Sequence, residues 1–225
     1  MGRVNKISLY IVLIFLFLIL SKNFSPSVQR SDYVENSAAF SEMFIGSFIS
    51  VVLLRSFQRG FLIKTYYQQY NIIHGFKGPE MVTVRTSQRF WNDSIKNTGM
   101  SIFRRQEVGT LESTTPMPPG TLYIGDPAYG RFKRYNSGGK RWFFHRAYRH
   151  FPTLFYWGTF RPSYEFFKKM KIFQESQRPF YGLNGEFGNT GAVTQRYLLS
   201  AYHGDKSKER QTDWWQQFKQ FLKFP

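Results

Sequence analysis

Residues that commonly perform catalysis are sparse in this 225-residue chain, and they form no known catalytic motif. The chain has four histidines and no cysteine, which excludes disulfides, thiolate metal sites and a cysteine nucleophile. His145 and His150 are five residues apart, so they face opposite sides of a strand and are misaligned on a helix. No HExxH motif is present, and we therefore expect no metal site and no other cofactor.

A glycine-rich run and one pair of carboxylates are the remaining candidates for chemistry. Glycines recur at every third position, at Gly182, Gly185, Gly188 and Gly191. This spacing matches neither a phosphate-binding loop nor a dinucleotide fingerprint, so we expect a looped connection. Glu186 and Asp126 could supply the carboxylate pair of a glycosidase. An envelope glycan-active enzyme is therefore one alternative, but we expect a non-catalytic protein.

Charge is the most distinctive property of the chain. Basic residues outnumber acidic ones 31 to 14, and the formal net charge is +17. Residues 125–182 hold only Asp126, Glu165 and Glu175 as acidic residues. The same segment holds twelve basic residues, which are Arg131, Lys133, Arg134, Lys140, Arg141, Arg146, Arg149, Arg161, Lys168, Lys169, Lys171 and Arg178. Aromatic residues are interleaved with these cations throughout the segment.

Three kinds of partner match a surface that is both basic and aromatic. In nucleic acid, cations neutralise phosphates and rings stack on bases, although no RNP, KH or helix-turn-helix pattern is present. Anionic membrane lipids attract Lys and Arg, with Trp and Tyr at the interface. Other protein subunits are bound by surfaces enriched in Arg and aromatic residues. We favour protein subunits, with lipid second and nucleic acid as the alternative.

Ten residues are the predicted contacts with a partner or lipid. They are Arg131, Arg134, Arg141, Trp142, Arg146, Arg149, Trp157, Trp214, Trp215 and Phe218. The last three lie on one face of a predicted amphipathic helix over residues 212–223, which Thr212 or Asp213 can cap. Such a helix docks in a partner's groove, lies in a membrane interface, or covers the protein's own core. We expect it to act as a clip, so deleting residues 212–225 should release the protein from its assembly.

Two apolar stretches near the N-terminus determine the predicted architecture. Residues 7–20 are apolar and follow Arg3 and Lys6, and no small-residue cleavage site comes after them. We therefore expect an uncleaved transmembrane helix rather than a removed signal peptide. Residues 38–54 are also largely apolar and are followed by basic residues, so a two-helix membrane hairpin is the alternative. Both predictions assign residues 1–60 to a membrane anchor region.

The remainder of the chain is predicted to be a small α+β protein. Residues 61–112 form a mixed connecting segment, with an aromatic helix over residues 61–74 and a strand over residues 81–86. Residues 110–120 contain three prolines and form the clearest linker.

Residues 121–225 form the predicted basic, aromatic-rich domain. We expect a strand at residues 121–124 and a β-hairpin from residues 131–135 and 140–144. A helix should begin after Ser163 and continue to about Gln177.

The function that best combines these features is that of a non-catalytic accessory subunit of a membrane protein complex. The anchor would hold it in a bacterial or mitochondrial inner membrane as a single-pass protein, and the basic domain would bind neighbouring subunits and anionic lipid. In composition, the chain is similar to the small, basic, aromatic-rich accessory subunits of energy-transducing membrane complexes. A ribosomal-type nucleic-acid-binding protein and the glycan-active enzyme are the alternatives.

Overall fold

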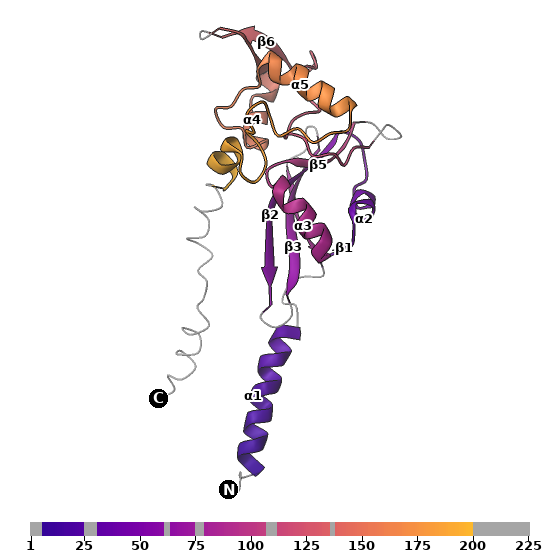
Figure 1. Cartoon of the computed structure of the whole chain (residues 1–225), viewed down its shortest axis with the longest axis vertical. Helices are drawn as coiled ribbons and strands as arrows, with labels where there is room; N and C mark the ends of the chain where they lie inside the picture. The colour runs from indigo at the N-terminus through magenta and orange to yellow at the C-terminus, as the bar shows by residue number, and fades with distance from the viewer. Residues whose placement is uncertain are drawn as a thin grey trace. The chain divides into compact units, whose positions relative to one another are not determined.

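A computed structural model describes most of the chain, and Figure 1 follows its elements from the N-terminus to the C-terminus. The described residues are 6–24, 31–60, 64–74, 79–106, 112–135 and 138–199. The chain divides into two compact units. The sheet unit comprises residues 1–98 and 103–114, and the aromatic unit comprises residues 99–102 and 115–225.

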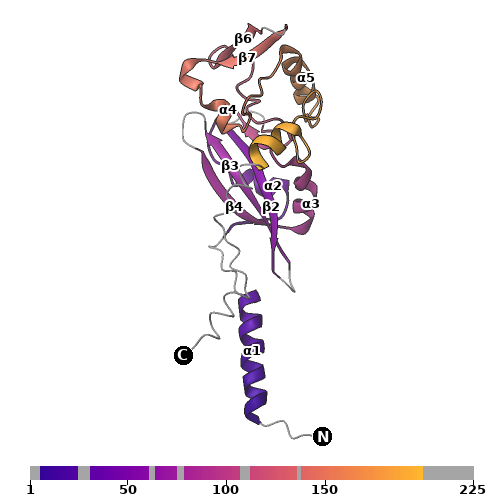
Figure 2. The same ribbon diagram turned by 90° about the vertical axis from the view of Figure 1, so that its left-hand side faces the viewer.

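The sheet unit is built on a five-stranded sheet with the strand order β1-β4-β3-β2-β5. Its strands are β1 (Tyr33–Val34), β2 (Ile49–Arg59), β3 (Thr65–His74), β4 (Glu80–Thr86) and β5 (Ser101–Arg105). Strands β2, β3 and β4 form an antiparallel meander, which Figure 2 shows side by side, and the short β1 runs parallel to β4. The register of β2 shifts between Leu53 and Arg55, which marks a β-bulge.

Two short helices cover one face of β3. Asn36 caps α2 (Ser37–Glu42) by accepting bonds from two backbone N–H groups, and Ser87 caps α3 (Gln88–Ser94). The ring of Phe40 in α2 lies 4.8 Å from that of Tyr70, and Trp91 in α3 lies 5.5 Å from Tyr66. A one-turn helix, η1 (Ile95–Asn97), follows α3.

The core of the sheet unit is mainly aliphatic. Its most deeply buried residues include Val34, Ile49, Val51, Val52, Leu53, Leu54, Ile73 and Val84. Tyr70 is also buried and donates to the Gln68 side chain at 2.7 Å, and burial raises the pKa of its hydroxyl.

The prediction of a membrane hairpin is wrong because residues 38–54 contain α2 and the first half of β2. Gly46 and Phe48 both have positive φ angles, and Arg105 Nη1 donates to the carbonyl groups of Phe44 and Gly46. These features turn the chain into a strand that starts with the β-branched Ile49. A central strand is buried on both faces, so its sequence is a continuous apolar run like that of a buried helix.

The predicted transmembrane anchor is also wrong, and with it the fold class that placed an anchor before a small α+β domain. No helix in the described part of the chain is both long enough and apolar enough to cross a membrane. The N-terminal helix α1 (Lys6–Phe24) has 19 residues, but its apolar stretch of residues 7–20 spans only roughly 20 Å, against a hydrocarbon core of ~30 Å. No described helix therefore supports the predicted single-pass topology. The observed fold is a mixed α/β structure built on the five-stranded sheet.

The aromatic unit contains one hairpin and several short helices. The hairpin pairs β6 (Gly130–Arg134) with β7 (Lys140–Phe144), as predicted. It is followed by η2 (Arg146–Tyr148), α4 (Phe151–Leu154), α5 (Tyr164–Glu175) and the π-helical η3 (Thr194–Leu199). The predicted start of α5 is confirmed, because the Ser163 side chain caps it by accepting a bond from the backbone N–H of Phe166.

Two local predictions are wrong. Residues 121–124 form a turn rather than a strand, because Gly120 has a φ of +84° and its carbonyl accepts a bond from the backbone N–H of Tyr123. The helix predicted over residues 61–74 is replaced by β3 from Thr65 onward, and residues 61–63 lie outside the described part. Strand β3 is buried over most of its length because it is paired along both edges, and its Thr, Tyr and Ile residues favour strands.

Aromatic rings make up most of the core of this unit. The largest fully buried side chains are Trp142, Trp157, Tyr123, Phe151, Phe155 and Phe166. The ring of Phe144 lies 5.2–6.1 Å from those of Phe151, Phe155 and Trp157. The indole N–H of Trp157 donates to the Pro119 carbonyl at 3.1 Å, which satisfies its buried polar atom.

Candidate functional site

The inner face of the β6–β7 hairpin belongs to the aromatic core. Phe132 and Trp142 are directly opposite each other in the ladder, and their rings are 5.0 Å apart. Gly130 is opposite Phe144, and a side chain at Gly130 would collide with the Trp142 ring. The backbone N–H of Trp142 donates to the Pro162 carbonyl at 2.8 Å, so β7 is also held by the segment that precedes α5. The hairpin therefore has a fixed orientation within the aromatic unit.

The outer face of the hairpin carries cations. Side chains alternate between the two faces of a strand, and the outer face receives Arg131, Lys133 and Arg141, together with Phe143. Arg131 and Lys133 are exposed, and Arg141 is half-buried. The strand register that buries Phe132 and Trp142 on the inner face therefore places these three cations together on the outer face.

Two pairs of cations are directly opposite each other across the hairpin. Lys133 is paired with Arg141 on the outer face, and next to the turn Arg134 is paired with Lys140, on the face of Phe132 and Trp142. Like charges at directly opposed positions destabilise a sheet, by about 0.2–1 kcal/mol per pair. The hairpin therefore holds an arrangement that is unfavourable for its own stability, and an anionic partner would relieve it.

Two aromatic rings lie among these cations, and cations cover them. The guanidinium of Arg141 lies 4.4 Å from the Tyr135 ring centroid, and the ammonium of Lys133 lies 5.8 Å from that of Phe143. The two rings also stack on each other, with centroids 6.4 Å apart and an interplanar angle of 23°. The cation–π contacts fix the positions of the charges, and the Tyr135 side chain is 42% exposed.

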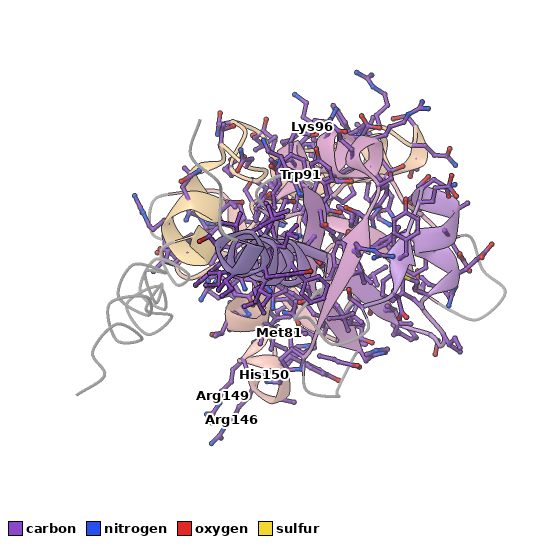
Figure 3. The ribbon with its side chains drawn as sticks, turned by 90° about the horizontal axis from the view of Figure 1, so that it is seen from below. Met81, Trp91, Lys96, Arg146, Arg149 and His150 are labelled. Atoms are coloured by element: carbon purple, nitrogen blue, oxygen red, sulfur yellow. The ribbon has the colours of Figure 1, made fainter. Side chains whose placement is uncertain are left out.

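The basic surface continues into the turn after the hairpin. Arg146 and Arg149 of this turn are exposed and project in the same direction (Figure 3). Residues 130–150 contain seven basic residues and no acidic residue. We call these seven the basic hairpin surface: Arg131, Lys133, Arg134, Lys140, Arg141, Arg146 and Arg149.

The cations of the basic hairpin surface have no carboxylate partner among the described residues. The one ion pair found in that part of the chain joins Arg105 to Glu112 in the sheet unit.

Five of the ten predicted contact residues lie on the hairpin or in the turn that follows it. Arg131, Arg134, Arg141, Arg146 and Arg149 all belong to the basic hairpin surface. Trp142 and Trp157 are 1% and 0% exposed and lie in the aromatic core, so the candidate surface does not include them. Trp214, Trp215 and Phe218, with the predicted helix over residues 212–223, lie outside the described residues.

Sequence reasoning did not select Lys133 and Lys140 of this surface, or the neighbouring Tyr135, as contacts. Lys133 is opposite Arg141, and the Tyr135 ring lies against the Arg141 guanidinium. The alternation of side chains along the predicted strands was the signal that could have identified Lys133.

The two carboxylates considered for catalysis, Glu186 and Asp126, do not line the same cavity. Glu186 lines a cavity, but Asp126 is not among the residues that line it and instead accepts a bond from the Ala128 N–H in a turn. His145 Nε2 lies 3.0 Å from the Pro127 carbonyl. Among the described residues, no group of three or more His, Cys, Asp and Glu side chains could hold a metal ion.

Comparisons with known proteins give no relative for this chain. No family model, no curated protein and no solved structure matches it.

Proposed function

We propose that this protein is a non-catalytic accessory subunit that docks on an acidic surface of a partner protein through the basic hairpin surface. The observation that carries the proposal is the pairing of like charges across the hairpin, at Lys133–Arg141 and Arg134–Lys140, with no carboxylate bound to them in the described part of the chain. Carboxylates of a partner would neutralise both pairs. The repulsion within each pair would therefore be relieved only when the partner is bound, and this relief would favour the complex.

The composition of the surface supports a protein partner. Five of its seven cations are arginines, and arginine forms planar, bidentate pairs with carboxylates and is enriched in protein interfaces. The hairpin that carries them is held on its inner face by Phe132 and Trp142. A fixed scaffold lowers the entropy that binding would otherwise cost.

The positions of the aromatic residues favour a protein partner over the other two. Single-stranded nucleic acid is bound by several open ring faces on which bases stack, whereas the Phe143 and Tyr135 rings stack on each other and contact Lys133 and Arg141. Binding to lipid headgroups uses exposed Trp and Tyr side chains; Trp142 and Trp157 are in the core, and Tyr135 is 42% exposed. The dominant property of this surface is its charge, which an acidic protein surface matches.

Charge reversal on the hairpin tests the proposal. The full-length protein would be purified under native conditions with its bound partners, as wild type and as the triple variant Arg131→Glu, Lys133→Glu, Arg134→Glu. The matched control is Lys168→Glu, Lys169→Glu, Lys171→Glu, which alters three exposed lysines of α5 and changes the charge equally. We expect the hairpin variant to lose a stoichiometric acidic partner that the control retains, and added salt to release that partner from the wild type.

Three results would contradict the proposal. The hairpin variant could retain its partners at full stoichiometry. Alternatively, nuclease treatment could remove the bound material, which would identify nucleic acid as the ligand. Finally, purified protein could bind phosphatidylserine vesicles while no protein co-purifies, which would identify a lipid surface. Circular dichroism of both variants shows whether they are folded.

A further inference from the structure

A cavity of about 380 Å³ lies in the aromatic unit, within the size range of small-molecule sites. Its lining comes from β7, from the segment leading into α5, from α5 itself and from the loop after α5. The lining residues are Arg141, Phe160, Arg161, Ser163, Phe166, Leu183, Asn184 and Glu186. The cavity thus combines apolar side chains with two guanidinium groups and one carboxylate, the mixture that orients a small polar ligand.

The carboxylate of Glu186 is held in place by its own loop. The backbone N–H of Asn184 donates to Oε2 at 3.0 Å, and the Asn184 side-chain amide donates to Oε1 at 3.2 Å. Gly182 has a φ of +108°, and a Cβ at that position would collide with Glu186 Oε2. Each oxygen of the Glu186 carboxylate therefore accepts one hydrogen bond. The loop can accommodate this carboxylate because Gly182 has no side chain.

The two guanidinium groups are positioned by different means. Nη1 of Arg161 donates to the carbonyls of Gly158 and Phe160, at 2.7 and 2.6 Å, which leaves its other N–H groups without a bond in the described part of the chain. Burial lowers the pKa of Arg161, while Tyr135 and Tyr197 act in the opposite direction. Arg141 rests on the Tyr135 ring.

Neither guanidinium forms an ion pair with Glu186, although all three groups line the same cavity. The two guanidinium groups and the carboxylate thus line one small cavity without forming an ion pair. A ligand with charges of both signs could therefore bind all three groups at once. Two positive groups and one negative group are matched by a molecule with two carboxylates and one ammonium. Phe160, Phe166 and Leu183 supply an apolar wall for its methylene groups.

We propose that this cavity binds a small acidic amino acid, with its carboxylates at Arg141 and Arg161 and its ammonium at Glu186. The cavity shares Arg141 with the basic hairpin surface but also requires Glu186, which lies outside that surface, so Glu186→Gln tests this inference without altering the proposed docking surface. Ser163 and Asn184 add polar side chains to the lining.

Calorimetric titration of the full-length protein tests the site with four probes: L-glutamate, L-glutamine, glutarate and inorganic phosphate. Glutarate keeps both carboxylates of L-glutamate but lacks the ammonium. We expect the wild type to prefer L-glutamate, and Glu186→Gln to weaken L-glutamate binding at least tenfold, roughly the cost of losing one charge-assisted hydrogen bond. The same variant should bind glutarate at least as well as the wild type does, because a negative charge has been removed.

The control is Glu175→Gln, which neutralises an exposed carboxylate on α5 outside the cavity and should leave all four affinities unchanged. Arg141→Gln should weaken L-glutamate and glutarate together, and it serves in place of Arg161→Gln, whose target also supports two backbone carbonyls. Absence of saturable binding to the wild type would overturn the proposal. So would phosphate binding as tight as L-glutamate binding, or an unchanged ratio of L-glutamate to glutarate affinity in Glu186→Gln.

Discussion

In the sheet unit the buried residues lie on long strands whose backbones pair with each other, whereas in the aromatic unit they lie on one hairpin, short helices and turns. Strand β3 is paired along both edges, and its neighbours carry Val51, Val52 and Val84 into an aliphatic core. The longest helix of the aromatic unit among the described residues, α5, has 12 residues, and α4 has 4.

The two units thus stabilise their hydrophobic cores in different ways. Aliphatic side chains bury little area each, so they need a regular ladder that repeats them at close spacing. Indole and phenyl rings bury far more area per residue, and their ring–ring contacts add about 0.5–1.5 kcal/mol per pair. In the aromatic unit a few rings, such as Trp142, Trp157 and Phe155, therefore stabilise irregular segments, and the outer face of the hairpin is left free to carry charge.

The strongest test of this comparison removes one ring. Trp157 is 0% exposed and contacts Phe144, Phe155 and Phe160. We expect Trp157→Ala to lower the free energy of unfolding by about 3–5 kcal/mol and to raise hydrogen exchange in peptides of the aromatic unit. Trp157→Phe, which keeps a ring, should cost clearly less. Equal losses in the two variants would show that ring packing is not the main source of stability here.

Matched glycine substitutions separate backbone strain from ring packing. Gly46 in the sheet unit and Gly120 in the aromatic unit both have positive φ, but a Cβ at Gly46 meets only Ile49, at 3.7 Å, whereas one at Gly120 lies 2.7 Å from the Phe155 ring. Gly46→Ala should lower the free energy of unfolding by about 1 kcal/mol, because alanine is strained at a positive φ angle. Gly120→Ala should cost about 2–4 kcal/mol, because buried rings must also move. Urea denaturation measures both, and similar costs would contradict a tightly packed aromatic core.

Each unit has a helix capped by a serine, and removing either serine should have a smaller effect on stability. Ser163 accepts one backbone bond at the start of α5, whereas Ser87 accepts a bond from Phe90 and also donates to the Glu35 carbonyl at 2.6 Å. Ser163→Ala should therefore lower the free energy of unfolding by about 1 kcal/mol. Ser87→Ala should lower it by about 1.5–2 kcal/mol, because a second hydrogen bond is lost. Thermal unfolding gives both values, and a larger loss for Ser163→Ala would show that the second bond of Ser87 has little effect.

The sequence predicted those elements whose signals are local. The glycine-containing turn between two aromatic, basic strands indicated the β6–β7 hairpin, and Ser163 before an apolar periodicity indicated α5. A helix cap and a hairpin turn are set by a few neighbouring residues, so they can be recognised without knowledge of the tertiary fold.

The sheet was missed because its signal depends on tertiary structure. Residues 49–54 are apolar apart from Ser50, and this pattern fits a buried helix, a membrane span or a central strand. Only pairing with β3 decides between them. For the candidate surface, the sequence predicted its charge and five of its arginines. It did not show which rings are buried, because Trp142 and Phe143 are neighbours in sequence and face opposite sides of the hairpin.

The smallest expected effect concerns the opposed charges of the hairpin. Lys140→Glu replaces a like-charge pair with an opposite-charge pair facing Arg134, and we expect a gain in unfolding free energy of about 0.5–1 kcal/mol at low ionic strength. The gain should disappear in 1 M salt, where screening acts over about 3 Å. Lys169→Glu on α5 is the control with the opposite sign, because it places a like charge four residues after Glu165. If Lys140→Glu instead destabilises the protein at low salt, the opposed cations are not a cost to the free protein, and the strongest argument for an acidic partner is lost.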